Sequence, residues 1–178
     1  VLDRLLSTPS SRVVTVTSGA HGGGKIDLDT FHTSEAGEHN AYGDSKLANI
    51  LFTLELQCRF ELINATTISV AASPGATKSD AVQNLIHSQK NRFMRVAADI
   101  LTNIVMESPE MGAMPSLRAS TDPQVKGGNY YGPGGFMGMR GYPKAKKPAE
   151  SADNETLALG LWERSTELTG VGYGKLHI

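Results

Sequence analysis

The chain has 178 residues, and its 17 lysines and arginines nearly balance 18 aspartates and glutamates, leaving a formal net charge of −1. Without a basic excess, it lacks the charge pattern of a protein that binds nucleic acid or an anionic membrane surface. The single cysteine, Cys58, excludes an internal disulfide and a cysteine-based zinc site, and the histidines show no metal-ligand spacing. No apolar run reaches the length of a membrane span. We therefore expect a cytoplasmic protein with no metal, no nucleic-acid partner and no membrane span.

The chain opens as if inside a helix, because residues 1–6 read as the last turns of one and the first residue is a valine. We therefore expect the C-terminal part of a longer protein. The β-branched run at residues 12–17 predicts a buried strand. The glycines at 22–24 predict a flexible loop, and His21 beside them is expected to be an ordinary loop residue rather than a proton relay.

A long helix is predicted over Ala41–Leu62 by apolar residues at spacings of three and four. One apolar stripe is expected to pack on a sheet, with Cys58 as a buried, inert thiol. The other is expected to meet a partner subunit, which predicts a homo-oligomer through this helix. The first stripe comprises Leu47, Ile50, Leu51, Leu54 and Cys58, and the second comprises Phe52, Leu56 and Phe60.

The remaining elements follow in an order typical of an α/β protein. Strands that alternate with helices predict parallel strands with helices on the faces of the sheet. The expected elements are a buried strand at 66–72, a mostly helical stretch at 81–106, a helix at 108–119 capped by Ser108, a brief strand at 129–131, a loop or extended tail at 133–148, and a helix at 151–168 capped by Ser151 or Asp153.

The chemically informative unit is residues 41–46, where Tyr42 and Lys46 stand four apart at the start of a helix and share one face. A lysine ammonium beside a phenol favours the phenolate, which a tyrosine needs to exchange a proton near neutral pH. Taken alone, the pair is better interpreted as two solvated helix residues. It stands, however, between two buried strands that end at Ser18 and Ser73, and parallel sheets gather ligand sites at the carboxyl ends of their strands. Ser18 is thus expected to hold a substrate carbonyl oxygen while Tyr42 transfers the proton.

Three blocks occur in a distinctive order: residues 12–21 (RVVTVTSGAH), 41–56 (AYGDSKLANILFTLEL) and 68–80 (ISVAASPGATKSD). Together they resemble the short-chain dehydrogenase/reductase family, and most closely its branch of retinol dehydrogenases and WW-domain oxidoreductases. The resemblance implies that residues 1–178 are one partial domain, the C-terminal portion of a Rossmann-like parallel sheet with flanking helices. That portion would hold the serine strand, the Tyr-x-x-x-Lys helix, a substrate lobe and a C-terminal helix.

The resemblance also implies an oxidoreductase that transfers a hydride between NADP or NAD and a small apolar alcohol or carbonyl substrate. Ser18 matches the family's catalytic serine, Tyr42 its acid/base, and Lys46 the lysine that binds the nicotinamide ribose. Pro74 and Gly75 match the family's loop that passes the nicotinamide, and Ser79 matches a cofactor-contacting residue that follows this loop. The implied cofactor-binding set is Tyr42, Lys46, Pro74, Gly75 and Ser79.

The family's glycine-rich phosphate loop does not precede the serine strand in this sequence. Residues 128–134 match its glycine spacing, but they follow the catalytic block and are expected to open no helix. We therefore expect residues 1–178 alone to be inactive, with the strand at 12–17 left as a bare apolar edge. Two alternatives stay open: a non-catalytic, truncated interaction protein of the same fold, and a nucleotide-sugar epimerase, whose relatives also use Tyr and Lys four apart. The Ser-Lys-Leu-Ala-Asn run at 45–49 argues against the epimerase.

Overall fold

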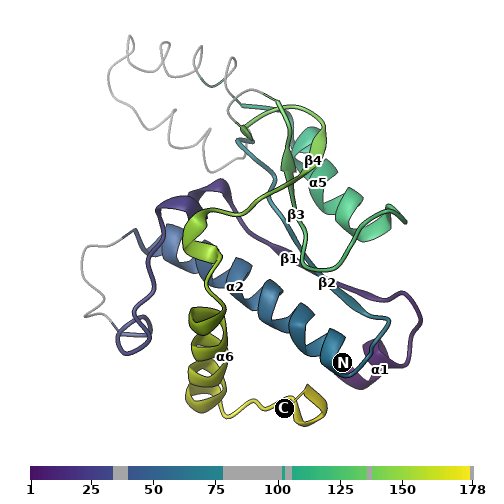
Figure 1. Cartoon of the computed structure of the whole chain (residues 1–178). Helices are drawn as coiled ribbons and strands as arrows, with labels where there is room; N and C mark the ends of the chain where they lie inside the picture. Colours follow the sequence, from purple (N-terminus) through teal and green to yellow (C-terminus); the bar gives the residue numbers. More distant parts are fainter. Residues whose placement is uncertain (34–39, 78–101, 103–105, 136–137, 177–178) are drawn as a thin grey trace.

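The computed structural model describes residues 1–33, 40–77, 102, 106–135 and 138–176. Its described strands form a four-stranded sheet in the order β1-β2-β3-β4 (Figure 1). As predicted, β1 (Arg12–Val16), β2 (Ile68–Ala72) and β3 (Tyr130–Pro133) run parallel to one another. The architecture is therefore α/β, with the polar candidates for a site at the carboxyl ends of parallel strands.

One strand contradicts the prediction. β4 (Pro143–Lys146) pairs antiparallel with β3, where the sequence predicted a loop or extended tail. Its sequence, PKAK, is rich in residues that are depleted from strands, so no local pattern marks it. It forms because β3 offers an open row of backbone groups, and its lysines suit a strand at the edge of a sheet.

Helices cover both faces of the sheet (Figure 1). The predicted long helix is α2 (Ala41–Leu62), which packs on one face, and α5 (Pro109–Thr121) packs on the other. Ser108 caps α5 as predicted, because its side chain accepts a hydrogen bond from the Met111 N–H at 3.4 Å. Alternate residues of β2 serve the two cores: Ala71 belongs to the cluster under α2, while its neighbours belong to the cluster under α5.

The remaining helices are short or lie on the outer side. The chain begins with α1 (Leu2–Leu6), as the sequence predicted, and its C-terminal helix is α6 (Glu155–Thr169). Asn154 caps α6, rather than Ser151 or Asp153 as predicted. Ser151 instead lies in a short 3-10 helix, η3 (Glu150–Ala152), and Asp153 ends that helix. The predicted helical stretch at 81–106 lies outside the described residues except for positions 102 and 106. No helix in the described part of the chain is long and apolar enough to cross a bilayer.

The outer side of α2 is covered by the chain itself. α6 packs against it at a steep angle (Figure 1), and Leu56 and Phe60 are buried in one cluster with Trp162 and Leu176. The second apolar stripe, which was expected to contact a partner subunit, therefore packs mostly against other elements of this chain. Cys58 is exposed, contrary to the prediction, because the first stripe leaves the core after the half-buried Leu54.

Candidate active site

The Ser18 loop begins where β1 ends. Ser18 is half-buried and caps the 3-10 helix η1 (Gly19–Gly23), with its Oγ accepting a hydrogen bond from the Ala20 N–H at 3.2 Å. The preceding residue, Thr17, is buried, and its hydroxyl donates to the Lys46 carbonyl oxygen at 2.8 Å. This bond joins the end of β1 to the first turns of α2.

The loop after Ser18 packs tightly against the start of α2. A Cβ atom on Gly24 would lie 2.5 Å from the Gly43 carbonyl oxygen, so the close approach requires glycine. The Asp44 carboxylate accepts a hydrogen bond from the Lys25 N–H at 2.7 Å and holds the far end of the loop. The predicted flexible loop is therefore wrong: residues 19–23 form a 3-10 helix fixed to α2.

Tyr42 and Lys46 share one face of α2, as their spacing predicts. The Lys46 ammonium lies 5.3 Å from the centroid of the Tyr42 ring. Lys46 is half-buried, while Tyr42 is 58% exposed, so a ligand can reach the phenol from solvent. Asn40 fixes the start of the helix, because its side chain accepts a hydrogen bond from the Gly43 N–H at 3.1 Å. The arrangement offers a cation beside an accessible phenol, which suits proton transfer.

The loop that follows β2 forms the second side of the candidate site. Ser73 is buried, and its hydroxyl accepts a hydrogen bond from the Gly75 N–H at 3.3 Å. Gly75 has a φ of 74°, and a Cβ atom there would lie 2.6 Å from the Met139 carbonyl oxygen, so only glycine fits. Pro74 is half-buried beside it, and Ser79 lies outside the described residues.

Two residues that the sequence did not assign to the site, His21 and Tyr130, connect its two sides. His21 is buried rather than an ordinary loop residue, and its ring meets the Tyr130 ring edge to face at 5.2 Å between centroids. The Tyr130 hydroxyl is hydrogen-bonded to the Ser73 side chain, and burial raises the pKa of Tyr130 above its ordinary value. No local pattern signals these contacts, because they join segments more than fifty residues apart.

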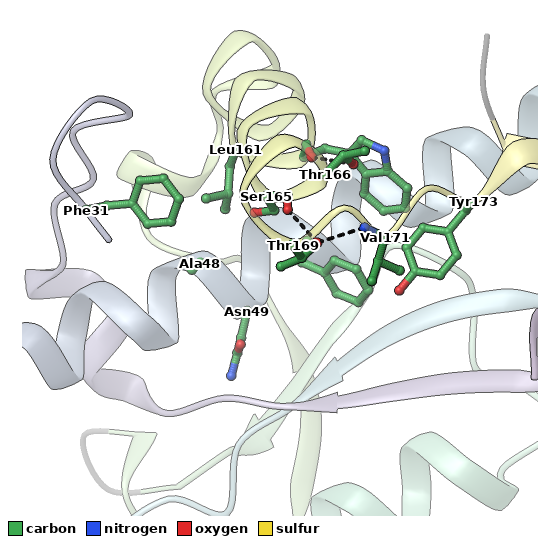
Figure 2. A pocket seen from close by; sticks show the side chains of 11 residues that line it. Phe31, Ala48, Asn49, Leu161, Ser165, Thr166, Thr169, Val171 and Tyr173 are labelled. Carbon is green, nitrogen blue, oxygen red and sulfur yellow. Dashed lines mark hydrogen bonds between the residues drawn. The ribbon is translucent and has the colours of Figure 1, made fainter. Parts of the chain in front are cut away.

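A separate pocket of about 410 Å³ lies between α2 and α6. Figure 2 shows its lining, to which α6 and the segment after it contribute most of the side chains. Asn49 is part of the lining, and its side chain donates to the Val16 carbonyl oxygen at 3.0 Å, at the edge of β1. Ser18, Tyr42 and Lys46 are not part of this lining, so this pocket is not the candidate active site.

Comparison with known proteins finds several dehydrogenases that are similar to this chain. It is 29% identical over 164 residues to human polyprenol dehydrogenase, covering 91% of this chain and 46% of the relative. It is 31% identical over 176 residues to human retinol dehydrogenase 13, covering 96% and 49%. It is 30% identical over 180 residues to bovine dehydrogenase/reductase SDR family member 13, covering 98% and 44%. No protein-family model matches the chain.

A solved structure is also similar to this chain. The crystal structure of an uncharacterised protein from Mycobacterium paratuberculosis matches with a TM-score of 0.68 and 28% identity, over 92% of this chain and 52% of that one. The chain is thus a homologue of the short-chain dehydrogenases/reductases, with part of a Rossmann-like fold, as its sequence predicted. It spans about half the length of the curated relatives it matches.

Proposed function

We propose that the chain carries the proton-transfer site of a cytoplasmic oxidoreductase that moves a hydride between NAD or NADP and a small apolar alcohol or carbonyl compound. The observation that carries the proposal is the Tyr42–Lys46 pair, with the ammonium 5.3 Å from the phenol ring and the Ser18 loop bonded to the same helix turn. The names of two relatives support an alcohol substrate, since retinol and polyprenols are apolar alcohols.

In this proposal three polar side chains have separate tasks in the proton transfer. The Tyr42 hydroxyl gives a proton to, or takes one from, the substrate oxygen, and the Lys46 ammonium stabilises the phenolate form. Because Ser18 Oγ accepts a hydrogen bond from the Ala20 N–H, its own hydrogen can be donated to the substrate oxygen. The substrate oxygen would then be held by two hydroxyl groups from different elements.

The described residues fit the nicotinamide end of the cofactor. An ammonium and a phenol on one helix face, both reachable from solvent, are a suitable donor set for the two hydroxyls of a ribose. When bound, the cofactor supplies or accepts the hydride. Pro74 and Gly75 would border it, and Ser79 follows them in the chain. The sequence holds no glycine-rich phosphate loop ahead of β1, so we propose that residues 1–178 alone neither bind the dinucleotide tightly nor turn over.

The test is Tyr42→Phe in the protein as it occurs in its source, assayed with an apolar primary alcohol and each nicotinamide cofactor. We expect kcat to fall by about 10²- to 10⁴-fold, the usual worth of an acid/base group, while the cofactor Kd changes little. Tyr173→Phe is the matched control, because it removes the same hydroxyl from the C-terminal segment, in the lining of the other pocket. A Tyr42→Phe protein with unchanged kcat would refute the proposal.

A second candidate, binding of a protein partner without catalysis, is favoured by the pocket between α2 and α6 and by the edge of β1. Val16 is 51% exposed there, and β1 pairs only with β2 among the described strands. A homo-oligomer through α2 would use this side, where Phe52 remains half-buried in the pocket lining. Light scattering on the native protein measures the assembly. A protein that is oligomeric but turns over no alcohol or carbonyl compound would favour this candidate.

A further inference from the structure

We propose that His21 is a positioning residue, which holds the Ser18 loop in its working conformation through a single tautomer of a neutral ring. The inference rests on the proposed function, because it assigns His21 a task only if Ser18 contacts the substrate. The observations that carry it are two hydrogen bonds made by opposite sides of one buried imidazole.

The partners of the ring determine its tautomer. Nδ1 lies 2.7 Å from the Ser18 carbonyl oxygen, which only accepts, so Nδ1 carries the hydrogen and donates it. Nε2 lies 3.0 Å from the Ala149 backbone nitrogen, which only donates, so Nε2 carries a lone pair. His21 is only 5% exposed, which leaves little room for water to replace either hydrogen-bond partner. The hydrogen bond at one nitrogen thus dictates the state of the other.

The bond at Nδ1 acts on the residue that the proposed reaction needs. The Ser18 carbonyl oxygen accepts from the His21 backbone N–H at 3.1 Å as well as from the ring, so two donors fix this peptide group. On the other side of Ser18, the Thr17 hydroxyl is bonded to the Lys46 carbonyl oxygen. Ser18 is therefore held on both sides, by Thr17 before it and by His21 after it. The direction of its Oγ depends in part on the hydrogen bond from His21.

The bond at Nε2 acts on a distant segment. Ala149 is 128 residues further along the chain and directly precedes η3, whose Ala152 is buried in the core under α2. A Cβ atom on Gly22 would lie 3.7 Å from the Ala149 Cβ, so the segment rests on the Ser18 loop. This contact stabilises the segment, and it does not by itself orient Ser18.

Three substitutions separate these tasks. His21→Asn keeps an N–H donor near the place of Nδ1 and loses the acceptor at Nε2. His21→Gln keeps an acceptor near the place of Nε2 and loses the Ser18 contact. His21→Phe keeps the flat ring beside Tyr130 and loses both hydrogen bonds, so it is the control for a role in packing alone.

The variants are compared in the protein as it occurs in its source, by kcat, KM and cofactor Kd. We expect His21→Gln and His21→Phe to lower kcat by about ten- to a hundredfold, the cost of a misplaced reacting group, with a much smaller change in KM. We expect His21→Asn to stay within about threefold of the native kcat, because it restores the Ser18 contact. A His21→Phe protein with native kcat, or a His21→Gln protein more active than His21→Asn, would overturn the inference.

A nitrogen-15 NMR spectrum of the same protein gives a readout that does not depend on turnover. We expect His21 to show the Nδ1–H tautomer, the less common one in water, whereas the exposed His32 should show the ordinary Nε2–H form. Loss of the signal in His21→Asn assigns it. An active enzyme whose His21 carries its hydrogen on Nε2 refutes this inference alone. An inactive native protein whose His21 carries it on Nδ1 refutes the proposed function, and the task of His21 with it.

Discussion

Arg59 is a buried cation near the end of α2, and replacing it tests whether the chain's own C-terminal elements close the outer side of that helix. Its Nε lies 2.7 Å from the Glu55 carboxylate, and its Nη1 donates to the Leu176 carbonyl oxygen at 2.6 Å. The guanidinium also lies 4.5 Å from the centroid of the Trp162 ring. One side chain thus ties α2 both to α6 and to the last described residues.

The magnitude of Arg59→Met follows from what it leaves behind. The side chains of Arg59 and Glu55 are only 7% and 12% exposed, so the change leaves a carboxylate nearly buried without its cation. Removing one partner of a buried ion pair costs about 3–5 kcal/mol. Loss of the contact between Arg59 and Trp162 is not additive with loss of the ion pair, because the same side chain makes both contacts. We expect the free energy of unfolding to fall by about 3–5 kcal/mol, a large share of the stability of a small domain.

The assay is urea denaturation followed by fluorescence and by far-ultraviolet circular dichroism. Trp162 is the chain's single tryptophan and lies against Arg59, so its fluorescence reports on the region that changes. Glu55→Gln combined with Arg59→Met should recover about 1–3 kcal/mol relative to Arg59→Met, because no unpaired carboxylate remains. A loss below about 1 kcal/mol for Arg59→Met, or no recovery in the double variant, would show that the pair does not hold these elements together.

Two further changes test the site and its surroundings. Gly24→Ala would place a methyl group 2.5 Å from the Gly43 carbonyl oxygen, so we expect a loss of about 1–3 kcal/mol in urea denaturation together with a lower kcat, whereas Gly174→Ala, with nothing within 4 Å, should change neither. Burial raises the pKa of Tyr130, against the smaller opposing effect of its bond to Ser73, so the unfolded state loses this proton at a lower pH than the folded state does. The free energy of unfolding should therefore fall as the pH rises from about 10, and Tyr130→Phe should flatten that fall; an equally steep fall in the variant would assign it to other groups.

The elements that could be predicted from the sequence are those decided within a few residues. The runs that form β1 and β2 are β-branched and apolar, and α2 repeats its apolar residues with a helical period, so local preference alone indicates these elements. The predicted burial of β1 is wrong, because β1 lies at the edge of the described sheet and none of its residues is fully buried. β4 could not be predicted, because its pairing with β3 overrides the poor strand preference of proline and lysine. Cys58 followed the period of α2 but not its burial: it is exposed, whereas Gln57 and Arg59 on either side of it are buried.

The same distinction applies to the site. Tyr42 and Lys46 could be paired from the sequence because residues four apart on a helix must share a face. The surroundings of Ser18 could not, because they depend on Lys46 through its backbone and on Ala149 far along the chain. A histidine near a glycine run has no local feature that distinguishes a buried, doubly bonded ring from a solvated one.

Several contacts within the described residues hold the proposed proton-transfer groups. The Ser18 loop is fixed to α2 by the Thr17 hydroxyl and by the close approach of Gly24 to Gly43, and to the segment before η3 by His21. None of these contacts involves the phosphates of a dinucleotide, for which the sequence holds no glycine-rich loop ahead of β1. Placement of the reacting hydroxyls and tight binding of the cofactor are therefore separable properties. The contacts on which the first depends include those of His21, so we expect its tautomer to be measurable by NMR independently of any turnover assay.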